Sequence, residues 1–279
     1  LEISNLKKVY KDTVAIDGLS FSVQQGQVFG LLGPNGSGKT TTLGILLGVL
    51  KQTEGTFSWF NNGSKDENRL RIGALLETPN FYPYLNAYDN LVVVARIKGM
   101  KNYDNRIDEV LKRVDLYERR KSKFKTFSLG MKQRLALAST MLSNPDVYVL
   151  DEPTNGLDPE GIAEIRNIII EIAKDGKTII IASHILDEIE KICTHVAILR
   201  KGKLLQIGEL KNVMTQERLL LIHSQDMDAL KKAINHIPHI NFVNVHEKEF
   251  LVGIPDNYDP ASLNKELAQQ GIYLSRLKK

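Results

Sequence analysis

The chain has 279 residues, of which 42% are apolar and 25% charged, and its formal net charge is +4. This composition is typical of a globular protein with a large core, built either as one large domain or as one domain with an appendage. The charge is too weak for the strongly basic face of a nucleic-acid-binding protein, so we expect no nucleic-acid partner. The sole cysteine, Cys193, excludes an intrachain disulfide and is typical of a reducing compartment. No apolar run approaches the roughly 20 residues that span a bilayer, so we expect any membrane role to depend on a partner.

The first two thirds of the chain alternate between strand-like and helix-like segments. Period-2 alternation, β-branched residues and short apolar runs predict strands, while apolar residues at helical spacing predict helices. The predicted strands are 1–9, 19–24, 28–32, 55–60, 71–76, 146–153, 178–183 and 195–200, and the predicted helices are 41–50, 87–98, 104–116, 129–142, 160–174 and 185–192. This alternation predicts an α/β fold with a mainly parallel sheet.

The pattern changes after Gly208. The last part of the chain predicts a strand, a helix, two strands around a tight turn, a second helix and a final strand, which is the split βαβ pattern. We therefore expect a first domain at 1–210 and a small α+β domain at 215–279, in which no catalytic cluster is apparent.

Residues 33–40 read GPNGSGKT and fit the pattern G-x-x-x-x-G-K-[ST] completely. Glycines at this spacing let backbone N–H groups close around phosphate oxygens, Lys39 neutralises the β and γ phosphates, and the Thr40 hydroxyl binds Mg²⁺. The following helix points its positive end at the same anion. A flexible glycine turn with a chance match is the alternative, but the loop lies between a buried strand and a helix. We expect ATP to contact Gly33, Pro34, Asn35, Gly36, Ser37, Gly38, Lys39, Thr40 and Thr41.

Asp151 and Glu152 follow the apolar run VYVL. A buried strand carries both acids to its carboxyl end, where ligands of open α/β sheets bind. We expect Asp151 to hold Mg²⁺, through water, and Glu152 to orient or deprotonate the attacking water. A solvated strand end is the alternative interpretation.

The main local excess of positive charge is YERRKSKFK, residues 117–125. We interpret this run as a solvated surface, and a docking patch for acidic lipid or for a partner is the alternative.

Residues 127–138 read FSLGMKQRLALA and resemble the signature helix of ABC-type ATPases, with Ser128 and Gly130 at key positions of its Ser-Gly-Gly-Gln core. Taken alone, the segment is an amphipathic helix with a serine N-cap. Its place about 90 residues after the phosphate loop, and just before the strand that ends in Asp151 and Glu152, makes the resemblance specific.

Further motifs lie where ABC-type ATPases have theirs. Residues 154–159, TNGLDP, resemble the D-loop of the family, with Asp158. His184, in the segment ASH, resembles the switch histidine and is expected to be catalytic together with Glu152 and Lys39. Tyr10 precedes the phosphate loop by 23 residues and resembles the aromatic residue that stacks on adenine. In isolation, the histidine and the tyrosine would be interpreted as structural residues.

The resemblance implies a P-loop NTPase fold of the ABC ATPase type, with a mixed sheet core, antiparallel N-terminal strands and a helical subdomain at about 85–145. It also implies a head-to-tail dimer, made by two copies or by the chain and a sibling ATPase. Each ATP would lie between the phosphate loop of one subunit and Ser128 and Gly130 of the other.

The single cassette and the short insertion before the signature resemble the ATP-binding subunit of a transporter whose polytopic membrane subunit is a separate chain. Such a subunit lies on the cytoplasmic face of the membrane and hydrolyses ATP to close and reopen the dimer. Residues 75–91 followed by SLGMKQR resemble bacitracin-resistance and lantibiotic-immunity exporters. Two alternatives are a cytosolic ABC ATPase that energises an assembly reaction, and a regulatory dimer module that binds ATP without useful hydrolysis.

Glu77 stands where most ABC cassettes have a glutamine at the end of the corresponding strand. An anionic oxygen suits Mg²⁺ better than an amide does, so we hypothesise that Glu77 joins Thr40 and Asp151 around the metal. A solvent-facing carboxylate at the start of a loop is the alternative. We also expect the aromatic segment 78–88 to contact the membrane subunit.

Overall fold

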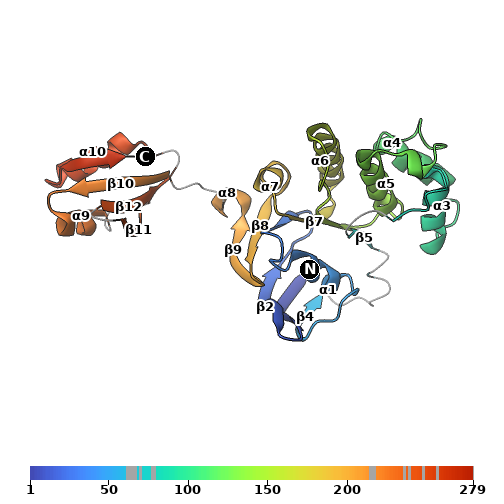
Figure 1. Cartoon of the computed structure of the whole chain (residues 1–279), viewed down its shortest axis with the longest axis horizontal. Coiled ribbons are helices and arrows are strands. Elements are labelled where there is room, and N and C mark those ends of the chain that lie inside the picture. Colours follow the sequence, from blue (N-terminus) through green and yellow to red (C-terminus); the bar gives the residue numbers. More distant parts are fainter. Residues whose placement is uncertain are drawn as a thin grey trace. The chain divides into compact units, whose positions relative to one another are not determined.

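A computed structural model describes residues 1–60, 68, 71–76, 80–213, 218–234, 237, 240–246, 249–255 and 258–278. The chain divides into two compact units, Leu1–Val213 (unit 1) and Met214–Lys279 (unit 2) (Figure 1). The sequence places this division between residues 210 and 215.

Among the described residues, unit 1 contains two sheets and the helices that pack around them. Its strands are β1 (Glu2–Tyr10), β2 (Thr13–Ser22), β3 (Val28–Leu32), β4 (Glu54–Ser58), β5 (Ile72–Leu75), β6 (Val147–Asp151), β7 (Thr178–Ser183), β8 (His195–Arg200) and β9 (Lys203–Glu209). Its helices are α1 (Lys39–Leu46), α3 (Ala87–Ile97), α4 (Asp104–Arg113), the 3-10 helix η1 (Phe124–Thr126), α5 (Leu129–Met141), α6 (Pro159–Lys174), α7 (Leu186–Ile192) and α8 (Leu210–Val213).

The larger sheet has the strand order β5-β6-β7-β3-β8-β9. Its first five strands are parallel, and β9 pairs with β8 in the antiparallel direction. Strands β3, β6 and β7 are buried almost throughout, as expected of parallel strands that are covered on both faces. Because they are parallel neighbours, their carboxyl ends meet at one edge of the sheet, which is where such sheets bind ligands.

The smaller sheet is antiparallel and has the order β2-β1-β4. It packs with α1 against one face of the larger sheet, and the rings of Phe21 and Phe29 stack there with their centroids 5.3 Å apart. The shared core contains apolar side chains from both sheets and from α1, including Leu6, Ile16, Leu19, Leu31, Leu43 and Val149. The opposite face of β3 and β7 contacts α7. The predicted fold class, an ABC-type α/β cassette with antiparallel N-terminal strands, is confirmed by this arrangement and by the structural neighbours described below.

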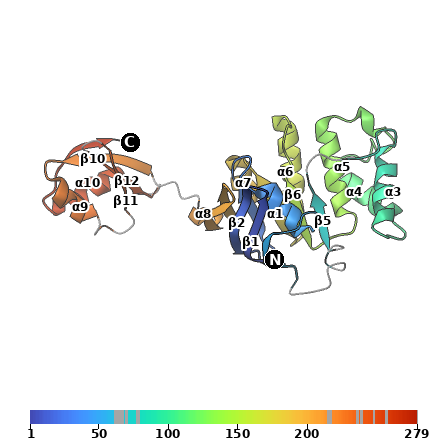
Figure 2. The same ribbon diagram turned by 60° about the horizontal axis from the view of Figure 1, so that its bottom comes forward.

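Helices α3, α4 and α5 contact one another. Figures 1 and 2 show them grouped on the far side of β5 from the three-stranded sheet. The apolar stripe of α4, formed by Ile107, Val110 and Leu111, is fully buried, as the amphipathic pattern predicts. The helix ends at Arg113, earlier than the predicted residue 116, and Asp115 has a φ of 54°. A residue in this left-handed conformation ends a helix.

Two strands differ from the sequence prediction. The strand predicted at 19–24 begins earlier, at Thr13, and β9 was not predicted at all. Strand β9 lies at one edge of the sheet, and most of its residues are exposed. It therefore lacks the apolar run that marks a buried strand.

The basic run 117–125 is exposed at Arg119, Lys121, Lys123 and Lys125, in agreement with the expected solvated surface. Phe124 is buried within it, and the Arg120 guanidinium lies 3.9 Å from the centroid of the Tyr117 ring. The run is therefore anchored to the fold by its aromatic residues.

Unit 2 has the element order β10 (Arg218–Ser224), α9 (Met227–Ile234), β11 (Asn241–His246), β12 (Glu249–Ile254), α10 (Pro260–Gln269) and β13 (Leu274–Lys278). Its antiparallel sheet has the order β11-β12-β10-β13, which is the predicted split βαβ topology. The helices bury Leu230, Ile234, Leu263 and Leu267 in a core that is separate from that of unit 1.

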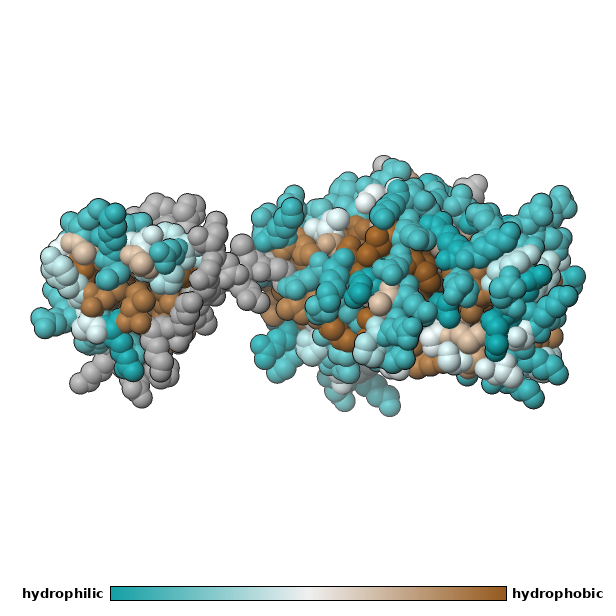
Figure 3. Space-filling view, turned by 90° about the horizontal axis from the view of Figure 1, so that it is seen from above, coloured by the Kyte–Doolittle hydropathy of each residue, from teal (hydrophilic) through white to brown (hydrophobic). Residues whose placement is uncertain are grey.

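Apolar residues reach the surface among polar ones in Figure 3. Within the described residues, none of the helices has the length and apolar content needed to cross a bilayer.

Candidate nucleotide site

The phosphate loop lies at the carboxyl edge of the large sheet, between β3 and α1. Strand β3 is the central neighbour of β7 and β8, so the loop leaves the sheet beside both of them. The Gly33 N–H donates to the carbonyl oxygen of Ser183 at 3.2 Å, and the Ser37 N–H donates to that of Pro34 at 3.1 Å. The loop is therefore tied to the end of β7 and closed on itself.

Two glycines of this loop are required by its packing. A Cβ atom on Gly33 would lie 2.3 Å from the Leu199 carbonyl oxygen. Gly38 has a φ of 102°, and a Cβ atom there would lie 2.7 Å from the Ala15 carbonyl oxygen. No side chain larger than hydrogen fits either position without moving backbone.

Lys39 is buried, with only 5% of its side chain exposed. Its Nζ donates to the carbonyl oxygens of Gly33 at 2.8 Å and Pro34 at 3.4 Å, and it lies 3.2 Å from Glu152 Oε1. A buried ammonium needs such partners because its desolvation is costly. The lysine therefore braces the loop and holds Glu152 at the same time.

Asp151 and Glu152 follow directly from the buried strand β6. Asp151 is its last residue and is only 3% exposed. Glu152 has a φ of 46°, in the left-handed region, and its N–H donates to the Ala182 carbonyl oxygen at 2.9 Å. Such a conformation is uncommon for a residue other than glycine and is concentrated at functional sites.

His184 follows the end of β7 and contacts Glu152. Its Nδ1 lies 2.8 Å from Glu152 Oε2. Since a carboxylate can only accept, the imidazole carries its hydrogen on Nδ1. The structure thus brings together the three residues predicted to be catalytic, with Glu152 between Lys39 and His184.

The remaining phosphate-loop residues surround the N-terminus of α1. Pro34, Asn35, Gly36 and Thr40 are exposed, and Thr41 is half-buried. The N-cap residue of α1 is a glycine and offers no side-chain acceptor to the first-turn N–H groups. An anion is the natural partner of such a helix end. We call residues 33–40 together with Asp151, Glu152 and His184 the phosphate-loop cluster.

Ser128 and Gly130 lie at the start of α5 and form what we call the signature end. Ser128 is the N-cap, and its Oγ accepts a hydrogen bond from the Met131 N–H at 3.3 Å. A Cβ atom on Gly130 would meet open space, and Leu129 between them is 43% exposed. Within the described residues, no hydrogen bond or ion pair joins the signature end to the phosphate-loop cluster.

Asp158 and Tyr10 lie outside these two groups. Asp158 is the N-cap of α6, where its Oδ1 accepts from the Gly161 N–H at 3.1 Å. Tyr10 is the last residue of β1 and is 43% exposed, with Lys8 Nζ 4.7 Å from its ring centroid. The tyrosine side chain is therefore partly open to solvent, with Lys8 over its ring.

Glu77, the predicted metal ligand at the end of β5, lies outside the described residues. Within the described part of the chain, no three His, Cys, Asp or Glu side chains gather in a way that could hold a metal ion. Thr40 and Asp151 are the described members of the predicted Mg²⁺ ligand set.

Sequence reasoning missed Glu188, a buried carboxylate on α7. Its carboxylate accepts hydrogen bonds from Thr154 and Ser183. Thr154 lies two residues after Glu152, and Ser183 directly precedes His184. The signal that could have found it is an acid four residues after His184, on the buried side of a short helix.

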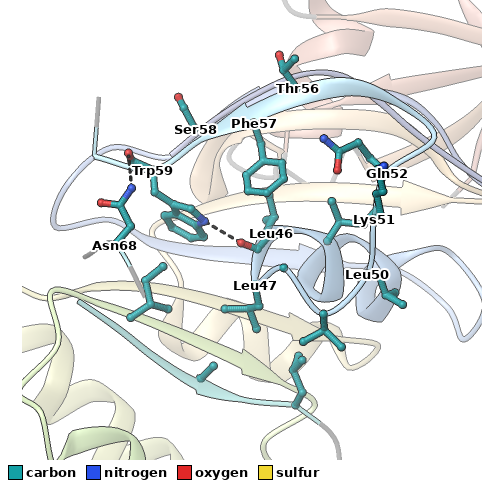
Figure 4. Close-up of a pocket in the computed structure, with 16 residues that line it drawn as sticks. Leu46, Leu47, Leu50, Lys51, Gln52, Thr56, Phe57, Ser58, Trp59 and Asn68 are labelled. Carbon is teal, nitrogen blue, oxygen red and sulfur yellow. Dashed lines mark hydrogen bonds between the residues drawn. The ribbon is translucent and has the colours of Figure 1, made fainter. Parts of the chain in front are cut away.

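An apolar groove of about 960 Å³ lies beside the C-terminal end of α1, between β4 and β5. Figure 4 shows Leu47, Leu50 and Phe57 among its lining side chains. The Trp59 Nε1–H donates to the Leu46 carbonyl oxygen at 2.8 Å and so closes one side. The nearby Val49 is 69% exposed. This is an open apolar surface on the same unit as the phosphate loop.

Comparison with known proteins identifies the family. The family model described as ABC transporter matches residues 16–155. The bacitracin transport ATP-binding protein BcrA of Bacillus licheniformis is 40% identical over 278 residues, which cover 98% of this chain and 90% of that protein. The lantibiotic transport ATP-binding protein SrtF of Streptococcus pyogenes is 39% identical over 205 residues, which cover 74% of this chain and 89% of that protein.

The solved structures agree. A dimeric structure of the ATP-binding cassette MJ0796, in a post-hydrolysis state bound to ADP and Pi, matches with a TM-score of 0.67 and 26% identity. The match covers 75% of this chain and 98% of that one. The resemblance to ABC-type ATPases, and within them to the bacitracin and lantibiotic transport proteins, is therefore confirmed. The chain belongs to the ABC transporter family, as an ATP-binding subunit.

Proposed function

We propose that the chain hydrolyses ATP and that this hydrolysis drives an exporter. The observation that carries the proposal is the position of Glu152, whose carboxylate lies 3.2 Å from Lys39 Nζ and 2.8 Å from His184 Nδ1. A carboxylate between a phosphate-binding lysine and an imidazole is well placed to take a proton from water beside the γ-phosphate.

The contacts indicate what each residue would do. The Lys39 ammonium, which contacts the Gly33 carbonyl oxygen and Glu152, would bind the β and γ phosphates. Glu152 would keep its contact with His184. Water attacks the γ-phosphorus and passes a proton to Glu152, the bond to the bridging oxygen breaks, and ADP departs with the electron pair. His184 holds the carboxylate in orientation throughout.

We propose Thr40, Asp151 and Glu77 as the Mg²⁺ ligands. Mg²⁺ is usually bound by one or two carboxylates together with substrate phosphates and water. A hydroxyl at the start of α1 and a buried carboxylate at the end of β6 fit such a site. The ion, when bound, neutralises the charge of the transferring phosphate.

The signature end supports a dimer in which each ATP is shared between subunits. Ser128 and the open space at Gly130 leave the first turn of α5 accessible to an anion from outside the unit. The cassette MJ0796 is dimeric with ADP and Pi. We propose that the phosphate-loop cluster of one subunit and the signature end of the other bind the same ATP here, in a homodimer or with a sibling ATPase. Asp158 and Tyr10 would contact the nucleotide at this interface and at the adenine, respectively.

The apolar groove beside α1 and the aromatic segment 78–88 are the proposed docking surface for a separate polytopic membrane subunit. The groove would take the apolar face of a short helix of that subunit, next to Val49. Tyr82 and Tyr84 are 48% and 64% exposed, and their rings lie 5.7 Å apart. Exposed apolar patches of this kind mark interaction sites. Through this contact, the chain would sit at the cytoplasmic face of the membrane.

We propose that the cargo is a membrane-active peptide antibiotic. The support is that BcrA is a bacitracin transport protein and SrtF a lantibiotic transport protein. The membrane subunit would select the cargo.

Three measurements test the proposal. The purified chain should release phosphate from ATP. A wild-type chain that binds ATP without hydrolysing it would favour a regulatory module instead.

A tagged chain expressed in its own host should co-purify with a polytopic membrane protein, and recovery with only cytosolic partners would favour an assembly ATPase. Deletion of the gene should lower resistance to bacitracin or to a lantibiotic.

A further inference from the structure

Glu188 is a buried acid in the first turn of the short helix α7. Only 5% of it is exposed, and its neighbour Ile189 is 1% exposed. Acidic side chains are rarely this buried unless they are paired. Among the described residues, the partners of its carboxylate are two hydroxyl groups and not a lysine or arginine.

Both hydroxyl groups donate to the same carboxylate oxygen, Oε2. Thr154 Oγ1 donates in a short hydrogen bond, and Ser183 Oγ donates at 3.4 Å. Thr154 and Ser183 are themselves only 3% and 2% exposed. The other oxygen of Glu188, Oε1, is buried and accepts no hydrogen bond from the described residues. The polar contacts of this carboxylate are thus concentrated on two side chains.

Each of the two hydroxyl groups belongs to a segment that carries a catalytic side chain. Thr154 stands two residues after Glu152, and Ser183 directly precedes His184. The Ser183 carbonyl oxygen also accepts the hydrogen bond from the Gly33 N–H at 3.2 Å. One buried carboxylate therefore ties together the turn after β6, the end of β7 and, through Ser183, the phosphate loop.

We propose, on the basis of the hydrolytic function proposed above, that Glu188 is a positioning residue that holds Glu152 and His184 in register through Thr154 and Ser183. Glu152 needs such support because its φ of 46° persists only where the surroundings fix it. The turn after it is short, with the Asn155 N–H donating to the Glu152 carbonyl oxygen at 3.1 Å. Anchoring Thr154 fixes this turn.

The two hydroxyl groups need an acceptor at this position. An amide would still accept from both of them through its carbonyl oxygen. An alanine would release both of them.

The test compares four single variants and one double variant of the full chain by ATPase rate, ATP affinity, thermal midpoint and pH–rate profile. Thr154→Val removes one hydroxyl donor and keeps the side-chain shape, and Glu188→Ala removes the acceptor. We expect each to lower kcat by roughly 10²-fold, the scale of a small misplacement of catalytic groups, with ATP affinity unchanged. Glu188→Gln should retain most of the rate. Glu190→Gln, an exposed acid on the same helix, is the matched control and should behave as wild type.

The double variant Thr154→Val/Glu188→Ala should be no slower than the slower single variant, because both changes remove the same contact. The apparent pKa of the pH–rate profile should also shift in both single variants, since the Glu152–His184 pair is displaced. Unchanged kcat in Thr154→Val, or additive losses in the double variant, would overturn the positioning role. So would losses of ATP affinity and thermal midpoint that match the loss of rate.

The two proposals fail differently. A wild-type chain that binds ATP and does not hydrolyse it contradicts the proposed function and the role of Glu188 together. An active wild type whose Thr154 and Glu188 variants are equally active contradicts only the role of Glu188.

Discussion

The phosphate-loop cluster and the signature end use their polar groups in opposite ways. In the cluster, Glu152 pairs with both Lys39 and His184, and Lys39 is almost fully buried. At the signature end, Ser128 only caps its own helix, and Gly130 faces open space. The phosphate-loop cluster pairs its polar groups within the chain, whereas the signature end presents its groups outward. This contrast supports a site that is completed by a second subunit.

Replacing the proposed base tests the internal chemistry of the cluster. Glu152→Gln should lower ATP turnover by about 10²–10⁴-fold because general-base catalysis is lost. ATP binding should persist, since Lys39 and the loop remain. Phosphate release and equilibrium nucleotide binding measure the two effects separately. A variant that retained wild-type turnover would remove Glu152 from its role.

Removing the lysine should instead act on binding. Lys39→Ala should weaken ATP binding by roughly 2–5 kcal/mol, the usual loss when one partner of a buried charge pair is truncated. Isothermal titration with ATP measures this. The control is Lys191→Ala, which removes an exposed lysine that pairs with Asp187 on α7. If Lys39→Ala bound ATP as tightly as this control, the phosphate loop would not hold the triphosphate.

The signature end should affect pairing more than binding. In a Glu152→Gln background, Ser128→Ala should weaken the ATP-dependent dimer by about 1.5–3 kcal/mol, the value of a hydrogen bond to a charged group. Sedimentation with and without ATP measures this. Asn86→Ala removes the side-chain cap of α3 and serves as the matched control. Equal dimer affinities for the two variants would reduce Ser128 to a helix cap.

Glu77 tests whether the cluster includes a third metal ligand. Glu77→Gln should raise the Mg²⁺ concentration for half-maximal ATPase activity by several-fold, because two unit charges 4 Å apart in water already attract by about 1 kcal/mol and Mg²⁺ carries two charges. Identical Mg²⁺ curves for variant and wild type would show that the carboxylate is not a ligand.

The last prediction concerns folding stability and the buried thiol of Cys193, the C-cap residue of α7. Burial raises the pKa of the Cys193 thiol from 9.0 to about 12. The folded chain therefore keeps a proton that the unfolded chain loses above pH 9.0, and the contribution of the thiol to stability falls as the pH rises toward 12. The loss is about 1.4 kcal/mol for each pH unit in this window. Urea unfolding between pH 8.5 and 10.5 should show a steeper decline for wild type than for Cys193→Ala, and parallel declines would mean that the thiol is accessible.

The sequence predicted the residues of the phosphate-loop cluster and of the signature end, but not the contacts that these residues make. The phosphate loop, the acids after β6 and His184 could be located because each follows a buried strand in a recognisable order. The contact between Lys39 and Glu152 could not be predicted, because it joins residues far apart in the chain whose approach depends on the parallel pairing of β3, β7 and β6. Glu188 was missed for the same reason, since its partners lie on two other segments.

One edge strand of the large sheet, β9, was also missed. Strand β9 is mostly exposed and is held by its pairing with β8. Exposed edge strands have no buried face to impose an apolar pattern. The groove beside α1 likewise arises only when β4 and β5 are brought next to that helix.

The most direct test of a site shared between two subunits is complementation in a mixture. Lys39→Ala disables the phosphate-loop cluster and Ser128→Arg disables the signature end, so each variant alone should be inactive. A mixed dimer carries one site in which an intact phosphate-loop cluster faces an intact signature end, so mixing the two variants should restore ATPase activity. Mixing wild type with the double variant Lys39→Ala/Ser128→Arg should add none. An inactive mixture whose variants still pair, or an active Ser128→Arg variant alone, would contradict the shared site.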